Sequence, residues 1–138
     1  MKNRHLAEDY RQRARIRLKA IETLLKEKAY ADVVRECQEA VELALKGLLR
    51  SWNIEVPRIH DVSEILEEES RSKPQGSQIK TNRLCRASRH LRRDRELAFY
   101  GSEDLTPSEF YKLEEAAEAL TLARDVIDAV DELWSSDA

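Results

Sequence analysis

The residues best suited to chemistry in this sequence are arginines gathered in one short segment, with a histidine among them. An arginine guanidinium stays protonated and offers a planar fork of donors that fits phosphate oxygens, while a histidine exchanges a proton near neutral pH. Steps of three and four residues place Arg86, Arg89 and Arg93 on one face of a helix. The arginines are Arg83, Arg86, Arg89, Arg92, Arg93 and Arg95, and the histidine is His90. Arginines this close repel one another unless an anion neutralises them.

Charge alternates along the chain, whose formal net charge is -3. Residues 71–95 carry nine Lys or Arg against one Asp or Glu, and residues 96–138 carry two against twelve. The acidic last helix, a partner chain or bound phosphates could neutralise the arginines, and spacing alone leaves both intramolecular salt bridging and anion binding open. The acidic residues of the last segment are interpreted as a solvated face. The overall acidity disfavours a protein that coats DNA nonspecifically.

Other kinds of site find little support in the residue pattern. The cysteines, Cys37 and Cys85, are isolated, and Cys37 falls in an apolar periodic stretch that predicts a place in the core. The three histidines, His5, His60 and His90, are far apart in the sequence. The sequence also has no glycine-rich phosphate loop. We therefore expect no metal, no cofactor and no disulfide framework.

Length and composition predict one helical domain over residues 1–138. The chain is long enough for one modest core, and three glycines and three prolines are few for its length. No apolar run reaches transmembrane length or has the form of a signal peptide. We therefore expect a cytoplasmic protein that does not enter the membrane.

Apolar periodicity predicts an all-α protein, an antiparallel up-and-down bundle of four long helices and one short helix. The expected helices span about 3–28, 31–51, 61–69, 79–100 and 107–133, and the longest loop is expected at Ser70–Gln78. Gly101 is expected to end the fourth of these helices. Thr106 and Glu109 form a capping-box pattern around a proline, which predicts the start of the last helix. Its buried stripe is expected to include Phe110, Leu113, Ala117, Leu120, Ala123, Ile127 and Val130.

The second expected helix has an unusually broad apolar stripe, which predicts contact with more than one neighbour. Its small residues Ala40, Ala44 and Gly47 would allow another helix to approach closely. Together with the opposed charge blocks, this stripe favours a homodimer.

The segment from Tyr30 to Leu66 resembles the HEPN family (higher eukaryotes and prokaryotes nucleotide-binding domains). As in that family, an aromatic residue opens a helix that carries the pattern Gln-x-Ala-x-Glu-x-x-x-Lys-x-Leu-Leu, and a His-Asp pair opens a short helix. The sequence RELAFYG, followed by a helix that begins at a proline, is also similar, so the resemblance runs from about Leu6 to Val130. The matching residues are Gln38, Ala40, Glu42, Lys46, Leu48, Leu49, His60, Asp61, Ile65 and Leu66.

The resemblance implies an all-α protein that forms a homodimer and binds RNA or a nucleotide. It also implies a minimal nucleotidyltransferase as partner, in a system of the toxin–antitoxin type. Active members of the family are metal-independent ribonucleases with an Arg, four to six further residues and a His at a dimer cleft. In such a site the Arg stabilises the charge of the scissile phosphate and the His moves a proton.

Matched to that motif, Arg95 is the candidate for holding the phosphate, and Tyr100 stands where the histidine is expected. A tyrosine with an ordinary pKa near 10 is a poor proton shuttle at neutral pH. His90, which six residues separate from Arg83, is the alternative proton carrier. The candidate catalytic residues are therefore Arg95 and Tyr100, with His90 as the alternative, and the match favours binding over cleavage.

Three hypotheses follow from the sequence. The leading one is a HEPN protein that binds RNA or a nucleotide at a basic dimer cleft. The second is a metal-independent endoribonuclease toxin that uses Arg95 with Tyr100 or His90. The third is a structural helical partner whose arginines bridge to acidic helices without binding nucleic acid. The residues expected to bind RNA or nucleotide are Arg86, Arg89, Arg92, Arg93 and Arg95.

Overall fold

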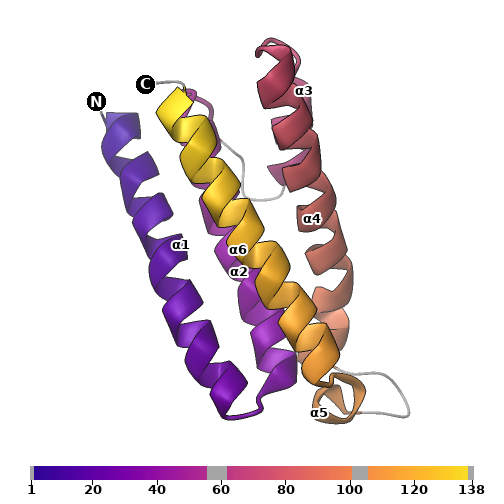
Figure 1. Cartoon of the computed structure of the whole chain (residues 1–138). Coiled ribbons are helices and arrows are strands. Elements are labelled where there is room, and N and C mark those ends of the chain that lie inside the picture. The colour runs from indigo at the N-terminus through magenta and orange to yellow at the C-terminus, as the bar shows by residue number, and fades with distance from the viewer. Residues whose placement is uncertain (1, 56–61, 101–105, 137–138) are drawn as a thin grey trace.

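The computed structural model describes residues 2–55, 62–100 and 106–136, and the side chains of residues 2–3, 93–100 and 135–136 lie outside this description. The helices are α1 (Lys2–Lys26), α2 (Tyr30–Ser51), α3 (Val62–Ser70), α4 (Gln75–Tyr100), α5 (Pro107–Phe110) and α6 (Leu113–Ser136). The four long helices form an antiparallel bundle, which confirms the predicted all-α class (Figure 1). Among the described residues, no helix combines the length and the apolar character needed to span a membrane.

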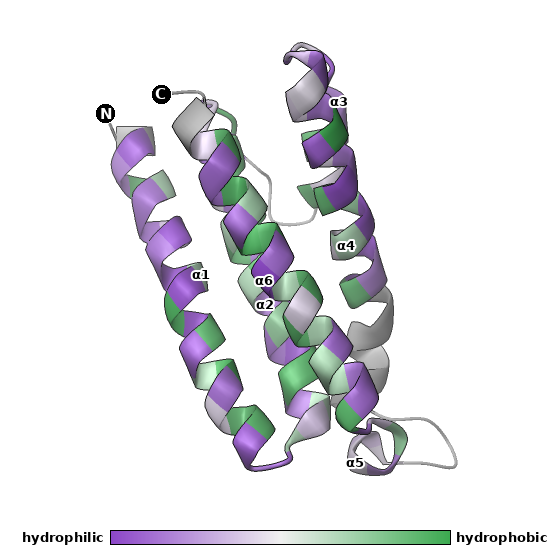
Figure 2. Ribbon diagram, viewed as in Figure 1, coloured by the Kyte–Doolittle hydropathy of each residue, from purple (hydrophilic) through white to green (hydrophobic). Residues whose placement is uncertain are grey.

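Helix α2 is the central element of the bundle. Twelve of its 22 residues are buried, and it contacts each of the other helices. The surrounding helices α1 and α4 are largely hydrophilic, with apolar residues at intervals along them (Figure 2). The broad apolar stripe of α2 therefore serves several neighbours within one chain, as the sequence predicted.

Helices α1 and α2 approach most closely at Gly47. A Cβ atom at this position would lie 3.1 Å from the carbonyl oxygen of Ala7 and 3.3 Å from the Cβ of Tyr10. Any side chain larger than hydrogen therefore presses on the backbone of α1. This confirms the predicted close approach at Gly47, whereas the roles of Ala40 and Ala44 stay predictions.

The first two helices end in the same way, with one residue in the left-handed region. Lys28 has φ 61° and Asn53 has φ 64°. After α1, the amide of Lys28 donates to the carbonyl of Leu25 at 3.0 Å. The amide of Ala29 donates to the carbonyl of Leu24, also at 3.0 Å. This is the Schellman pattern, in which the final carbonyls of a helix are satisfied as the chain turns away. It produces the break that the sequence predicted between the first two helices.

The long loop predicted at Ser70–Gln78 is wrong, because α4 begins at Gln75. The carbonyl of Pro74 accepts a hydrogen bond from the amide of Gln78 at 3.0 Å, so the helix starts directly after the proline. Proline lacks an amide proton, but the first residues of a helix have no use for theirs. The proline is thus part of the helix start and not a sign of a loop.

The predicted capping box is confirmed. The Thr106 hydroxyl oxygen accepts from the Glu109 amide at 3.2 Å, and the Glu109 carboxylate accepts from the Thr106 amide at 3.2 Å. The Thr106 hydroxyl also donates to this carboxylate at 2.8 Å. These hydrogen bonds lower the pKa of Glu109, with the one from the Thr106 side chain contributing most.

The continuous last helix that the sequence predicted is wrong. Helix α5 ends at Phe110, Tyr111 is extended with φ -93° and ψ 130°, and α6 begins at Leu113. At this break Tyr111 is 2% exposed and belongs to the core. Three residues of the predicted stripe are not buried: Phe110 and Leu113 are 38% and 54% exposed, and Ala117 is also exposed. The predicted stripe is correct from Leu120 onward.

Both cysteines are buried in the core. Burial raises the pKa of Cys37 to about 12, so its thiol stays neutral at physiological pH. The Cys85 thiol donates to the carbonyl of Ser63 at 3.3 Å. The sequence-based prediction of Cys37 as a core residue is confirmed.

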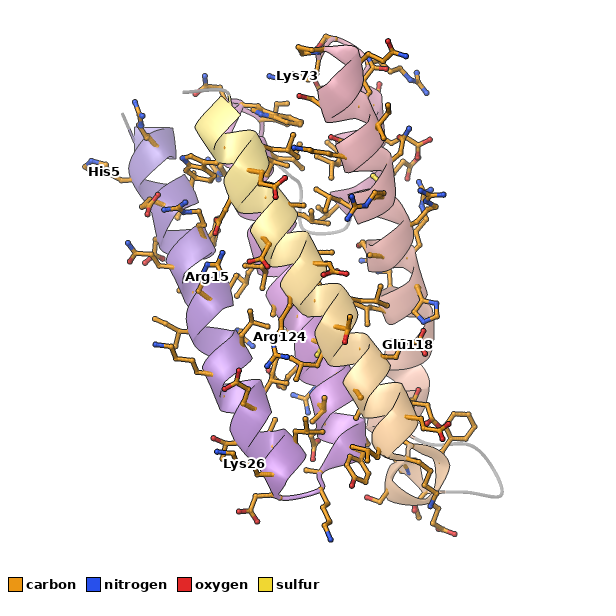
Figure 3. The ribbon with its side chains drawn as sticks, viewed as in Figure 1. His5, Arg15, Lys26, Lys73, Glu118 and Arg124 are labelled. Atoms are coloured by element: carbon orange, nitrogen blue, oxygen red, sulfur yellow. The ribbon has the colours of Figure 1, made fainter. Side chains whose placement is uncertain are left out.

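Helices α1 and α6 are joined by ion pairs at their exposed edges. Arg15 pairs with Asp131 and, at 3.1 Å, with Asp128, and these contacts, led by Asp131, raise the pKa of Arg15. Farther along the two helices, Arg124 pairs with Glu22 at 2.8 Å. Figure 3 shows Arg15 and Arg124 between the two helices. Direct polar contacts thus connect two helices that share α2 as their apolar neighbour.

Replacing Gly47 with valine is expected to destabilise the protein by about 1–3 kcal/mol, because the side chain would overpack the α1–α2 crossing. Gly76→Val is the matched control, since nothing lies within 4 Å of a Cβ at that position of α4. The control is expected to be neutral or stabilising by up to about 1 kcal/mol. Urea unfolding followed by circular dichroism gives both values, and equal values for the two variants would contradict the close approach.

Thr106→Ala is expected to raise the pKa of Glu109 toward its ordinary value, because the carboxylate loses its strongest hydrogen bond. In the unmodified protein, a lowered pKa in the folded state stabilises the cap above the ordinary pKa of glutamate. This contribution is lost as the pH falls through the lowered value. A carboxyl-detected NMR titration measures the shift. Thr106→Ser keeps the hydroxyl and should keep the low pKa, so an increase with serine as large as with alanine would exclude this cause.

Candidate functional site

The basic residues of α4 contact acidic residues on three different helices. His90 and Lys80 face α6, Arg89 faces α3 and Arg92 faces α2. The pairs are Lys80–Glu132 at 2.9 Å, His90–Glu118 at 3.3 Å, Arg92–Glu42 at 3.3 Å and Arg89–Glu67. Intramolecular ion pairing therefore accounts for part of the positive charge of this helix.

These ion pairs differ in how far they are withdrawn from water. The side chain of Glu42, on the central helix, is 16% exposed, whereas that of Glu67 is 44% exposed. A carboxylate that is largely buried needs a partner, while an exposed one is solvated by water. Arg92 therefore has a structural role against α2, and Arg89 remains on the surface.

Arg83 and Arg86 are different, because neither forms an ion pair within the described part of the chain. Both are exposed, and both line a cavity of about 400 Å³ between α4 and α6. His90 lines the same cavity from the same helix. Three of the basic side chains singled out in the sequence thus meet at one site.

The opposite wall of this cavity is acidic. Glu118 and Asp125 line it from α6, and they lie seven residues apart, which is about two helical turns. Glu118 pairs with His90 across the cavity, and Figure 3 shows Glu118 on the side of α6 that faces α4. Asp125 forms no ion pair with a described residue. We refer to this space between the basic wall of α4 and the acidic wall of α6 as the α4–α6 cavity.

The antiparallel register of the two helices explains which residues face one another. Lys80 pairs with Glu132 and His90 with Glu118, so rising numbers on α4 meet falling numbers on α6. Seven residues back from His90 is Arg83, and seven residues on from Glu118 is Asp125. These two side chains therefore lie at the same level, on opposite walls of the α4–α6 cavity, without forming an ion pair.

The floor of the cavity is apolar. Leu84 and Val126 are buried beneath it, and Ala87 and Leu122 are half-buried at its sides. The site therefore combines an apolar base with charges of opposite sign on two walls. In the described part of the chain, no group of three or more His, Cys, Asp or Glu is arranged to hold a metal ion.

The structure brings together some of the residues expected from the sequence and separates others. Arg86 and His90 share the α4–α6 cavity, whereas Arg89 and Arg92 lie against other helices. Arg93, Arg95 and Tyr100 continue the backbone of α4, but their side chains lie outside the described residues. The same holds for His60, Asp61 and Gly101 as whole residues.

Sequence reasoning missed the acidic wall. The sequence pattern predicts a solvated face that includes Glu118 and Asp125, because a single helix does not reveal which of its acids faces a neighbour. Their spacing of seven residues, together with Leu122 between them, was the available signal. It becomes informative only once the register of α4 and α6 is known.

Comparison with known proteins gives two similarities. The sequence model of the HEPN domain family matches residues 7–133 of this chain. The crystal structure of TT1696 from Thermus thermophilus is similar at 26% sequence identity, with a TM-score of 0.62, over 91% of this chain and 96% of that one. No curated protein matches the chain.

Arg92→Ala is expected to destabilise the protein by about 1–3 kcal/mol, because it leaves the largely buried Glu42 carboxylate without its partner. Arg89→Ala removes the same charge from the same helix but frees only the exposed Glu67, so it should cost less than about 1 kcal/mol. Chemical denaturation of the two variants side by side gives this difference. A cost for Arg89→Ala as large as for Arg92→Ala would contradict the structural role of Arg92.

Proposed function

This chain belongs to the HEPN domain family, and we propose that it binds RNA or a nucleotide through the exposed arginines of α4. The family is generally connected with nucleotides and RNA. The proposal places the binding residues on one surface, the α4 basic face, formed by Arg83, Arg86 and Arg89, with Arg93 and Arg95 farther along the same helix.

The observation that carries the proposal is the pair of exposed arginines, Arg83 and Arg86, that have no acidic partner among the described residues. Arg83 and Arg86 stand beside Arg89 at steps of three residues, or about 4.5 Å along the helix. Their mutual repulsion is relieved when an anion joins them, and phosphate oxygens match the guanidinium fork. Since Arg89 and Arg92 already have acidic partners, Arg83 and Arg86 are the residues that most favour a ligand.

The wider setting of this function rests on the family resemblance. We propose a homodimer with the α4 basic faces at a shared cleft, acting with a minimal nucleotidyltransferase in a system of the toxin–antitoxin type. The residues predicted from the sequence to bind are Arg86, Arg89, Arg92, Arg93 and Arg95, and we add Arg83 because it lines the α4–α6 cavity. Of these, Arg92 would contribute mainly by its charge, because its side chain pairs with Glu42.

A second candidate function is metal-independent RNA cleavage, and one contact favours it. The His90 Nε2 atom lies 3.3 Å from the Glu118 carboxylate, an arrangement that orients an imidazole for proton transfer. Arg83 and Arg86 line the same cavity and would hold a phosphate near that ring. In this second candidate function, His90 carries the proton, and the motif formed by Arg95 and Tyr100 is not used.

Binding of a fluorescently labelled single-stranded RNA, followed by anisotropy over a series of KCl concentrations, tests the binding function. The double variant Arg86→Ala/Arg89→Ala is expected to weaken RNA binding. It should also reduce the slope of the logarithm of the binding constant against the logarithm of the KCl concentration by about 1.4, or about 0.7 for each lost phosphate contact. The variant Arg4→Ala/Arg13→Ala removes the same charge from exposed positions on α1 and should keep the original slope.

The same RNA, incubated with EDTA, separates the other hypotheses. Cleavage that disappears in His90→Ala would support the ribonuclease. Failure of the unmodified protein to bind RNA or a nucleotide even at low salt would contradict both functions and leave a structural helical partner.

A further inference from the structure

We propose that the α4–α6 cavity binds one ribonucleoside monophosphate, with its phosphate on Arg83 and Arg86 and the donors of its base or ribose on Asp125. The inference rests on the proposed function and narrows its ligand. RNA lying along the α4 basic face would need only the arginines, whereas the cavity offers two further kinds of contact.

The two charged walls of the cavity favour a ligand with an anionic group at one end and hydrogen-bond donors at the other. Arg83 and Asp125 lie at the same level and line the same space, yet they form no ion pair. A simple anion would be attracted by the arginines but repelled by Asp125. A simple cation would be attracted by Asp125 but repelled by the arginines. A nucleotide offers phosphate oxygens at one end and neutral N–H or O–H donors at the other, so it satisfies both walls.

The floor favours a ligand with a flat or ring-shaped apolar part. Leu84 and Val126 are buried under the cavity, and Ala87 and Leu122 flank it. Inorganic phosphate makes no use of this surface, whereas a base or a ribose ring covers it and removes it from water. The volume of about 400 Å³ lies within the range of roughly 300–1,000 Å³ found for small-molecule sites.

One end of the cavity is closed by a contact between its walls. His90 and Glu118 meet across it at 3.3 Å, seven residues along α4 from Arg83, which is about 10.5 Å. A strand of RNA crossing the cavity along α4 would have to break this pair. A single nucleotide fits between the pair and Arg83, and this favours a mononucleotide.

Isothermal titration calorimetry with AMP, and separately with inorganic phosphate, tests the site. Arg83→Ala is expected to lower the affinity for AMP at least tenfold. Asp125→Asn is expected to weaken AMP binding several-fold but to leave phosphate binding unchanged or tighter, because it replaces one acceptor oxygen with an NH2 donor and removes a negative charge. Arg13→Ala on α1 is the charge-matched control for Arg83→Ala and should leave AMP affinity unchanged. Arg83 and Asp125 are exposed and without ion pairs in the described chain, so their variants should fold normally.

Opposite effects of Asp125→Asn on the two ligands would support the acidic wall as a recognition element. Tightening of AMP by Asp125→Asn, or no AMP binding at millimolar concentration, would overturn the inference. The RNA titration with Arg86→Ala/Arg89→Ala is independent of Asp125. If the unmodified protein binds RNA but not AMP, the cavity site alone is overturned. If it binds neither RNA nor AMP, the proposed function is overturned as well.

Discussion

The burial of α2 is the constraint on which the rest of the bundle depends. Leu45, Leu48 and Leu49 are completely buried, and each such side chain contributes about 1.5–3 kcal/mol through its removal from water. A helix with apolar residues on so much of its surface is stable only when other helices cover it on several sides. Helices α1, α4 and α6 provide this cover, and each needs only one apolar stripe because each has α2 as its neighbour. The outer faces of these helices are thereby left to carry charge.

The distribution of charge on α4 follows from that arrangement. Some basic residues of α4 are paired with acids of neighbouring helices: Lys80 with Glu132 on α6 and Arg92 with Glu42 on α2. Arg83 and Arg86 lie where α4 and α6 leave a space between them, and no acid of the described chain reaches them. Internal neutralisation therefore accounts for Lys80, Arg89 and Arg92, whereas anion binding by Arg83 and Arg86 stays a prediction.

Local sequence patterns predicted the helices well wherever a single signal, such as a continuous apolar period, applied to a segment. The second helix was placed to within one residue of its observed bounds, Tyr30–Ser51, because its apolar pattern is continuous. The errors arose where two rules competed. Pro74 was interpreted as a loop residue although it precedes the first turn of α4, and the cap at Thr106 was extended into a helix that the chain leaves at Tyr111.

The cavity could be predicted only in part, for a different reason. The arginines and His90 are visible in the sequence as a cluster on one helix, but Glu118 and Asp125 join them only through the register of α4 against α6. That register is set by packing on α2, which no local spacing encodes. The roles of Arg95 and Tyr100 stay predictions, since their side chains lie outside the described residues.

The exposed ion pairs of the bundle, among them those between α1 and α6, make its outer edges sensitive to ionic strength. Arg15, Arg124 and their partners are partly open to solvent, so dissolved ions compete for them, and the screening length falls from about 10 Å at 0.1 M salt to about 3 Å at 1 M. The apolar seams along α2 do not weaken in this way. A rise in ionic strength therefore loosens the outer edge between α1 and α6 while the centre of the bundle keeps its packing.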